Sequence, residues 1–425
     1  MKKRLWQIGI DEYAPLIGEE AVERIMEKAH RLRGLRVLHI SSTFYGGGVA
    51  EILSSETLLA NHLGLHADWR LIQGSPDFFN VTKKIHNALQ GSAINLTELK
   101  KDIYEEVNVQ NAIRMELEAD FVVVHDPQPL PLIMHERHTC PWVWRCHVDL
   151  SHPNPEILDY LRPFIDEYDA VVVSLPEYAQ EIAPPQVFVM PAINPFSVKN
   201  ADMSEAEVKD RFDHYGIPDD LPIVAQISRF DRWKDPEGVI EAFHIARKEV
   251  DATLVLLGNV ATDDPEGQEV FESLLGKREE RIMILTAEDS ALVNALQRHA
   301  AVVFQKSLRE GFGLTATEAM WKGTPVIAGR CGGLLHQIED GVNGFLASSV
   351  EEAARRMVEL LKDDQLRRTL GGKARDTVRE RFLMSRKIEQ CLDLFAAFEP
   401  TFTLNHRRAG VLKPGTPQHT AGQRR

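Results

Sequence analysis

Two glutamates that stand eight positions apart, Glu310 and Glu318, have the clearest chemical potential in this sequence. They lie in the stretch REGFGLTATEAMWKG, where Gly311 and Gly313 keep the backbone bare before a predicted helix. The N–H groups at 313 to 315 could hold a phosphate at the start of that helix. Two carboxylates cannot serve the same phosphate, so we expect them to bind hydroxyl groups on either side of it. A purely structural interpretation, with Glu318 in the first turn and favoured by the helix dipole, explains only one of the two glutamates.

Two cations follow another predicted strand, in the stretch ISRFDRWKD. Arg229 and Lys234 lie five positions apart on the loop that leaves the strand. Arginine offers a planar fork of donors and lysine a point charge, and together they suit a diphosphate. Taken alone, such a pair is more typical of ordinary surface charge.

Three consecutive glycines, Gly46 to Gly48, follow the apolar run VLHIS and precede a helical stretch at 51–62. Glycine tolerates positive φ and lets a ligand approach the backbone closely, and the following helix would aim its positive end at that ligand. A tight turn between strand and helix is the simpler interpretation. Two further polar groups end predicted strands: His125 and Asp126 in VVVHDPQP, and residues 145–149 in WRCHVDLS.

Short β-branched runs that alternate with helical segments must position these residues. Six runs precede and six follow a break between Asn194 and Pro222. Continuous apolar strands separated by helices indicate parallel sheets that are covered on both faces. We therefore predict an α/β protein of two doubly wound, Rossmann-like domains, with ligand in a deep cleft at the carboxyl ends of the strands. The runs are 37–41, 67–72, 120–126, 142–148, 170–174, 187–191, 223–228, 252–258, 281–285, 301–305, 324–329 and 344–347.

The break sets the predicted domain limits. Residues 1–195 form the N-terminal domain and residues 196–383 the C-terminal domain. A helix within 384–404 is expected to cross back and pack on the first domain. The tail, 405–425, lacks a core-forming pattern and is predicted to be disordered.

Composition narrows the class of protein. The 425 residues include 49 Lys and Arg against 63 Asp and Glu, a formal charge of −14, which disfavours nucleic acid and anionic membranes as partners. No apolar run approaches the roughly 18 residues of a membrane span. The four cysteines form no disulfide framework, and the N-terminus does not resemble a signal peptide. We expect a cytoplasmic protein.

Five motifs, taken together and in order, resemble the retaining GT-B nucleotide-sugar glycosyltransferases, the clan of glycogen synthase and sucrose synthase. Within that clan, GGGVAE, HDPQPL, WRCHVDLS, SRFDRWKD and REGFGLTATEAMWKG are similar to the trehalose glycosyltransferring synthases. The similarity covers about residues 35 to 395. It implies a GT-B fold and a retaining transfer of glucose from UDP- or ADP-glucose to free glucose. The product would be α,α-trehalose, in a reaction that can be reversible.

The resemblance also implies roles for individual residues. Arg229 and Lys234 would neutralise the leaving diphosphate. Glu310 would bind hydroxyls of the donor glucose and His147 would contact the transferred sugar, completing the catalytic group, while Glu318 would bind the ribose. The donor site would also include Gly47, Gly48, Leu285, Phe312, Gly313, Leu314 and Thr315, and the acceptor site Gly46, Asp126, Gln128 and Asp149.

No metal or other cofactor is expected to be required, because Arg229, Lys234 and a helix N-terminus already offset the negative charge of the donor. A non-essential Mg²⁺ and a homodimer are both compatible with the sequence. No separate nucleophile is evident, which favours same-face attack, in which the leaving phosphate oxygen takes the proton of the acceptor. Retention of configuration follows from the resemblance and not from spacing.

Other functions stay open. A retaining trehalose phosphorylase would share the fold and the two glutamates but would use phosphate, so it would need no ribose ligand such as Glu318. Another acceptor, such as glycerate or a sugar phosphate, is also compatible. A phosphorylated acceptor would need cations near the glycine loop, where the sequence has no basic cluster, since Lys83 and Lys84 lie further on. A nicotinamide-dependent dehydrogenase is disfavoured because GGGVAE lacks the G-x-G-x-x-G spacing, and a zinc hydrolase because HERH at 135–138 falls one residue short of H-E-x-x-H.

Overall fold

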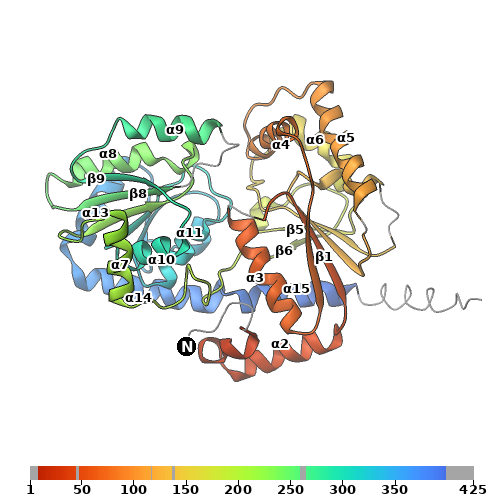
Figure 1. Cartoon of the computed structure of the whole chain (residues 1–425), viewed down its shortest axis with the longest axis horizontal. Helices are drawn as coiled ribbons and strands as arrows, with labels where there is room; N and C mark the ends of the chain where they lie inside the picture. Colours follow the sequence, from red (N-terminus) through yellow and green to blue (C-terminus); the bar gives the residue numbers. More distant parts are fainter. Residues whose placement is uncertain (1–7, 45–46, 116, 136–138, 259–264, 399–425) are drawn as a thin grey trace, which may run out of the picture.

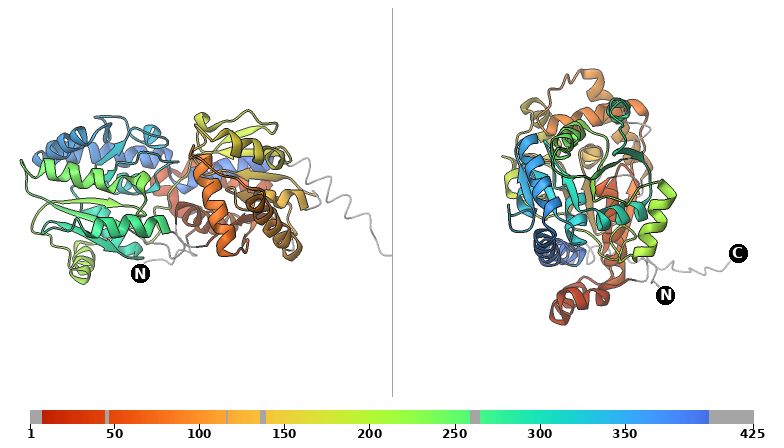
Figure 2. Two further views of the ribbon diagram at one scale, coloured as in Figure 1. Left: turned by 90° about the horizontal axis from the view of Figure 1, so that it is seen from above. Right: turned by 90° about the vertical axis from the view of Figure 1, so that its left-hand side faces the viewer.

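The computed structural model arranges the chain as two α/β lobes that face each other (Figure 1). It describes residues 8–44, 47–115, 117–135, 139–258 and 265–398. Within this part of the chain each lobe has a six-stranded sheet, and every strand pairing is parallel. Two further views show helices on both sides of the sheets (Figure 2). The predicted α/β fold of two doubly wound sheets is confirmed.

The first sheet has the strand order β2-β1-β3-β4-β5-β6. The winding direction changes between β1 and β3, so the carboxyl ends of these two strands form a switch point, where ligands bind in open α/β sheets. The loops that leave this point carry the glycines and the HDPQP motif. The strands are β1 (Arg36–Ser41), β2 (His66–Leu71), β3 (Phe121–His125), β4 (Trp142–Arg145), β5 (Ala170–Val173) and β6 (Gln186–Phe188).

Alternate side chains of the first sheet belong to two different cores, as the period of two in a strand requires. Leu38 and Ile40 of β1 join a core with α4, α5 and α6, whereas Val37 joins a core with α2 and α3. Local signals place the helix ends: Ser75 caps α4 by accepting the N–H of Phe78. The helices are η2 (Ile10–Tyr13), α1 (Ala14–Ile17), α2 (Glu19–Arg31), α3 (Gly48–His62), α4 (Pro76–Leu89), α5 (Glu98–Arg114), η3 (Leu130–His135), α6 (Pro155–Ile165) and η4 (Pro176–Tyr178).

The second sheet has the order β12-β11-β10-β7-β8-β9, with its switch point between β7 and β10. The loops after these two strands carry ISRFDRWKD and the two glutamates. The sheet therefore brings together two motifs that lie about eighty residues apart in the sequence. Its strands are β7 (Ile223–Ile227), β8 (Thr253–Gly258), β9 (Ile282–Thr286), β10 (Val302–Gln305), β11 (Val326–Gly329) and β12 (Phe345–Ala347).

Helices cover both faces of the second sheet as well. Ala225 of β7 packs in a core with α7, α10, α11 and α14, and its neighbour Val224 packs with α8, α9 and α13. The helices are α7 (Glu205–Tyr215), η5 (Arg232–Lys234), α8 (Pro236–Ala246), α9 (Pro265–Leu275), α10 (Ser290–His299), α11 (Leu314–Trp321), α12 (Leu334–Gln337), α13 (Val350–Lys362) and α14 (Asp364–Arg381).

Helix α15 (Met384–Ala397) follows the second lobe in sequence but packs on the first. Ile388 and Leu392 enter the core that contains Val37. Lys387 pairs with Glu56 of α3 inside the protein. The predicted helix at 384–404 is therefore seen up to residue 397, while its last positions and the tail at 405–425 lie outside the described residues.

All twelve predicted runs form strands whose ends differ from the predictions by at most three residues. One local expectation is wrong: Glu318 is the fifth residue of α11 and does not lie in its first turn. Among the described residues, no helix is both long and apolar enough to span a bilayer.

Candidate active site

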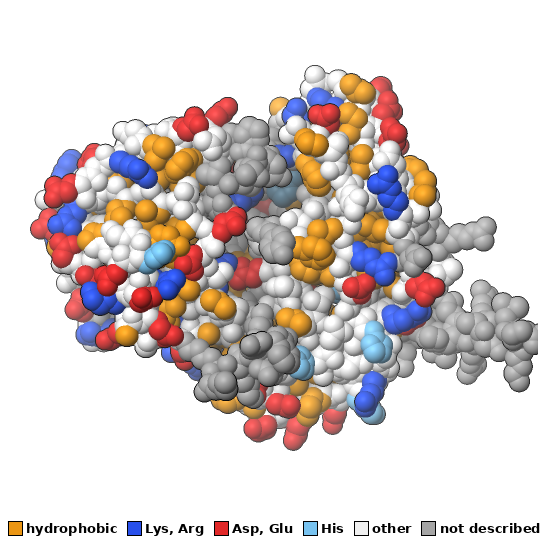
Figure 3. Space-filling view, viewed as in Figure 1, with side chains coloured by type: hydrophobic (Ala, Val, Ile, Leu, Met, Phe, Trp, Pro, Cys, Tyr) orange, Lys and Arg blue, Asp and Glu red, His pale blue; other side chains and the backbone are white. Residues whose placement is uncertain are grey.

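A cavity of about 390 Å³ lies between the two lobes, and its walls come from the carboxyl ends of both sheets. A space-filling view shows the surface hollowed where the lobes meet, with charges of both signs interspersed around it (Figure 3). This volume falls within the usual range of small-molecule sites. The predicted site residues that line it are Gly47, Gly48, Asp126, Gln128, His147, Arg229, Lys234, Glu310, Phe312, Gly313, Leu314 and Thr315.

The glycine loop lets the two lobes approach each other. Gly47 has a φ of +90°, in the region that favours glycine, and it caps the N-terminus of α3. A Cβ added to Gly48 would lie 2.7 Å from Cδ1 of Leu314 in the opposite lobe. Gly48 is therefore needed for close contact across the cavity as well as for a bare backbone. Gly46, the remaining glycine of the predicted acceptor site, lies outside the described residues.

Lys234 and Glu310 form an ion pair in the wall of the cavity. Nζ of Lys234 lies 2.6 Å from Oε2 of Glu310, and both side chains are largely buried. The same carboxylate oxygen accepts hydrogen bonds from Nε2 of Gln305 at 2.9 Å and from Oγ of Ser307 at 3.2 Å. Three donors thus fix the orientation of the Glu310 carboxylate before any ligand binds.

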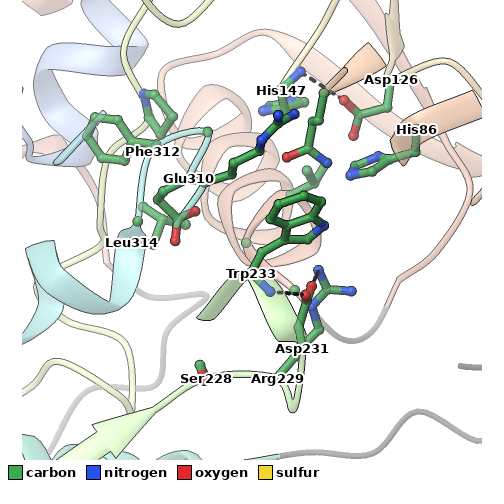
Figure 4. Close-up of a pocket in the computed structure, with 18 of the residues that line it drawn as sticks. His86, Asp126, His147, Ser228, Arg229, Asp231, Trp233, Glu310, Phe312 and Leu314 are labelled. Carbon is green, nitrogen blue, oxygen red and sulfur yellow. Dashed lines mark hydrogen bonds and ion pairs between the residues drawn. The ribbon is translucent and has the colours of Figure 1, made fainter. Parts of the chain in front are cut away.

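Arg229 lies on the same side of the cavity (Figure 4). About half of its side chain is exposed, and its guanidinium lies 3.6 Å from Asp231. This loose pairing leaves the guanidinium accessible to an anion in the cavity. Together, Arg229 and Lys234 give the wall from the second lobe two cationic groups.

The loop before α11 presents backbone N–H groups to the cavity. Gly313 caps the helix with a φ of +92°, which a residue with a Cβ rarely adopts. Phe312, Leu314 and Thr315 line the cavity beside it. The helix begins at Leu314, and its N-terminus can attract an anion.

Asp126 and His147 stand together on the opposite wall (Figure 4). Oδ1 of Asp126 accepts the backbone N–H of His147 at 2.8 Å. Asp126 is a non-glycine residue with a φ of +64°, a strained conformation of the kind that concentrates at functional sites. Burial raises the pKa of its carboxyl to about 6, although the His147 N–H and Arg145 favour the charged form.

Gln128 follows Asp126 along the same loop and lines the cavity. Its Oε1 is buried and has no hydrogen-bond partner within the described part of the protein. Oε1 of Gln305, on the opposite wall, is likewise buried without a hydrogen-bond partner among the described residues. Because a buried acceptor is costly to leave unsatisfied, both oxygens suit hydroxyl donors of a ligand.

Three predicted site residues do not line the cavity. Glu318 is buried in α11, where it accepts from Nε2 of Gln297 at 3.0 Å and lies 3.5 Å from Nζ of Lys199. Leu285 packs partly buried in β9, at the edge of the second sheet. Asp149 accepts the N–H of Ser151 at 2.9 Å. A direct role in binding for these three residues stays a prediction.

Sequence reasoning missed one wall of the cavity, which comes from α4. Lys83, His86, Asn87 and Gln90 all line it, so Lys83 is brought to the cavity near the glycine loop although it lies further on in the sequence. The sequence does contain a pattern for this wall: the four residues form a polar stripe at helical spacing, opposite the apolar face that enters the core. Only the fold, however, shows that the stripe faces the glycines.

The α4 wall is nevertheless mostly neutral. Burial, together with the nearby cations Arg229, Lys83 and Lys234, lowers the pKa of His86 to about 3. His86, Asn87 and Gln90 therefore offer uncharged hydrogen-bonding groups, with Lys83 as the cation of this stripe. Trp233 and Arg309 are among the residues of the second lobe that were also missed, and the Arg309 guanidinium lies 4.8 Å from the Trp233 ring centre.

The described residues contain no cluster of three or more His, Cys, Asp or Glu side chains that could hold a metal ion. The charged groups in the cavity are instead suited to an anion with hydroxyl groups on both sides. Cations and a helix N-terminus stand beside an oriented carboxylate, and a neutral polar wall faces them.

Two family models match this chain. The one described as the N-terminal domain of trehalose synthase matches residues 39–180, and the one described as group 1 glycosyl transferases matches residues 207–377. The matched segments include the loops that line the two sides of the cavity.

Individual proteins show the same relationship. Trehalose synthase of Pyrococcus horikoshii is 42% identical over 395 residues, which cover 91% of this chain and 95% of that protein. Trehalose synthase of Rubrobacter xylanophilus is 42% identical over 405 residues, covering 91% and 96%. Trehalose phosphorylase of Grifola frondosa is 30% identical over 427 residues, covering 87% of this chain but 58% of that protein.

Solved structures with similar folds are more distant in sequence. α,α-Trehalose 6-phosphate synthase of Burkholderia multivorans has a TM-score of 0.67 at 14% identity, covering 88% of this chain and 100% of that one. Sucrose-phosphate synthase of Thermosynechococcus elongatus has a TM-score of 0.65 at 18% identity, covering 85% and 98%. These likenesses identify the fold as GT-B. The chain therefore belongs to the trehalose synthase family of GT-B glycosyltransferases, and it is a trehalose-related hexosyltransferase.

Proposed function

We propose that this protein transfers glucose from a nucleotide-glucose, UDP- or ADP-glucose, to free glucose and forms α,α-trehalose with retention of configuration. One observation carries the proposal: the cavity joins a cationic wall with an oriented carboxylate to a largely neutral polar wall. The first suits a sugar diphosphate and the second an uncharged sugar. The related proteins are named trehalose synthases, which supports trehalose as the product.

On the donor side, Arg229, Lys234 and the N-terminus of α11 bind the diphosphate. Lys234 exchanges part of its interaction with Glu310 for a phosphate oxygen, while Gln305 and Ser307 keep the carboxylate in place. Oε1 of Glu310 then accepts a hydroxyl of the donor glucose. This arrangement needs no metal ion to balance the charge of the leaving group.

On the acceptor side, glucose lies between α4 and the loop after β3. His86, Asn87 and Gln90 are neutral groups that exchange hydrogen bonds with hydroxyls, and Oε1 of Gln128 accepts one more. A phosphorylated acceptor would place about two charges against this wall, to which α4 contributes one cation, Lys83. We therefore favour the unphosphorylated sugar.

Transfer occurs on one face of the donor sugar. The carboxylate of Glu310 is held by three donors and Asp126 by the N–H of His147, so neither is placed here as a nucleophile. The acceptor hydroxyl instead attacks from the side of the departing diphosphate. Its proton passes to the phosphate oxygen that leaves, so bonds and charges balance without an enzyme-bound intermediate.

Trehalose phosphorolysis is a second candidate, and one observation favours it. Glu318, whose expected ribose contact distinguished the synthase from the phosphorylase, lies outside the cavity and is engaged by Gln297. A phosphorylase would place inorganic phosphate at Arg229 and Lys234. The similarity to the synthases extends over nearly their whole length, whereas the matched phosphorylase is much longer than this chain.

Product analysis separates the two functions. The protein is incubated with free glucose and each nucleotide-glucose in turn, with EDTA in parallel samples, and the disaccharide is identified by NMR and by an α,α-specific trehalase. A second reaction contains trehalose and phosphate. Formation of trehalose and nucleotide diphosphate in the first reaction supports the proposal. Formation of glucose 1-phosphate in the second reaction, with no trehalose in the first, contradicts it.

A matched pair of variants ties the activity to the cavity. Arg229→Ala removes a phosphate ligand and should lower kcat/KM for the donor by roughly 10- to 100-fold, as expected for a charge-assisted bond. Arg232→Ala is the control, because this neighbouring arginine is two-thirds exposed and pairs with Glu269. Equal losses in both variants would show that the loop, and not the Arg229 charge, is responsible.

A further inference from the structure

Three histidine side chains form a hydrogen-bonded row that starts at the cavity. Nδ1 of His39 lies 3.0 Å from Nε2 of His125, and Nδ1 of His125 lies 3.0 Å from Nε2 of His147. Adjacent ring centres are 5.3 Å apart in both pairs. His125 and His147 line the cavity, whereas His39 does not and is only 2% exposed. The row therefore runs from the cavity into the interior of the first lobe.

The sheet itself builds this row. His39 lies on β1, His125 ends β3, and His147 follows β4, and these three strands are neighbours in the order β1-β3-β4. Parallel neighbouring strands bring side chains near their carboxyl ends to the same edge. The backbone of His147 is fixed separately by Asp126 at 2.8 Å, so its ring and its main chain have different supports.

The row is uncharged at neutral pH. Burial lowers the pKa of all three imidazoles below the ordinary value. Two charges stand behind the row, the carboxylate of Glu56 and the ammonium of Lys387, and they pair with each other. Arg145 lies near the cavity end and further lowers the pKa of His147.

Neutral imidazoles impose a matching rule on such a row. Each has one N–H and one bare nitrogen, so each N···N contact needs a donor on one side and an acceptor on the other. Two arrangements satisfy both contacts: all three rings protonated on Nδ1, or all three on Nε2. Any mixed arrangement sets two N–H groups or two lone pairs against each other, and a buried polar atom then loses its hydrogen bond.

We propose that this row fixes the ring orientation of His147 and ties its tautomer to those of His125 and His39, which makes His39 a positioning residue for the histidine that is expected to contact the transferred sugar. The contact with the sugar rests on the proposed function, but the matched tautomers do not. A group that meets the substrate in a fixed protonation pattern needs no reorganisation during the reaction. His39 acts through His125 and does not touch the substrate.

Two substitutions at His39 separate hydrogen bonding from packing. His39→Asn keeps an amide close to the position of Nδ1, whereas His39→Leu fills the space without any polar group. Loss of one aligned hydrogen bond should lower kcat about tenfold in His39→Leu. His39→Asn should stay within about threefold of the wild type. Neither change should alter the affinity for nucleotide diphosphate. His66→Leu, at an exposed position on β2, is the matched control.

Nitrogen NMR of the protein labelled with ¹⁵N-histidine reads the tautomers directly and without substrate. We expect the same tautomer for His39, His125 and His147 in the wild type, and a mixture at His147 in His39→Leu that His39→Asn removes. Different tautomers in the wild type would overturn the proposal. So would equal kcat losses in the Asn and Leu variants with an unchanged His147 signal. Matched tautomers in a protein that forms no trehalose would instead contradict the proposed function and leave the row intact.

Discussion

Replacing Glu310 by glutamine tests the centre of the proposed donor site. Three donors, from Lys234, Gln305 and Ser307, converge on Oε2 at 2.6, 2.9 and 3.2 Å. No described residue donates to Oε1, which leaves this oxygen for a sugar hydroxyl. An amide has one carbonyl oxygen, so Glu310→Gln can accept either from the protein donors or from the sugar. It also removes the negative charge that strengthens each of these bonds.

Glu310→Gln is expected to lower the catalytic rate and to leave the affinity for nucleotide diphosphate nearly unchanged. A lost charge-assisted bond that positions the reacting carbon should lower kcat roughly a hundredfold, or about 2.7 kcal/mol. The affinity for UDP or ADP should stay within about threefold, because the diphosphate lacks the sugar and Lys234 is released from its ion pair.

Steady-state kinetics and calorimetry with the free diphosphate measure the two effects separately. Glu241→Gln is the control, since this glutamate is exposed on α8. A kcat within about threefold of the wild type, or a tenfold weaker diphosphate complex, would refute the assigned role of Glu310.

Three further substitutions test other parts of the site. Glu318→Gln should raise the donor KM and weaken free diphosphate nucleotide by about tenfold if this glutamate reaches the ribose, and unchanged calorimetry would exclude that role. Gly48→Ala places a Cβ 2.7 Å from Leu314 and should lower kcat/KM by roughly tenfold. Adding Leu314→Ala should restore it, and Gly372→Ala, in open space on α14, should have no effect. The raised pKa of Asp126 means that its ionisation destabilises the fold as pH rises from about 4 to about 6. The Tm of Asp126→Asn relative to the wild type should therefore be higher at pH 7.5 than at pH 4.5, and a constant difference would contradict the buried carboxylate.

Local patterns were sufficient to predict the architecture. Runs such as VLHIS and IVAQIS are mostly apolar, without a polar residue at every second position, because both faces of their sheets are covered, and they became β1 and β7. Glycine and helix signals likewise predicted that a helix starts just after Gly313, and α11 begins at Leu314. These features depend on neighbouring residues, which the sequence displays directly.

The composition of the site was predicted in part. Arg229, Lys234 and Glu310 were placed together because each follows a strand, and the carboxyl ends of parallel strands meet at one edge. The sequence placed Glu318 on the helix after Gly313, but it showed neither that this glutamate lies beyond the first turn nor that it is buried against Gln297. A side chain's position on a helix does not show which neighbouring element packs against it.

The sequence alone thus determined the fold class, the strands and the loops that carry the charged groups, since hydrophobic periodicity and turn chemistry are local. Only the tertiary structure decided that the polar stripe of α4 faces the glycine loop and that Gly48 touches Leu314. It also decided that His39 reaches His147 through His125. Each of these contacts depends on the order of strands in a sheet or on the approach of two lobes, which bring together residues that have no relationship in sequence.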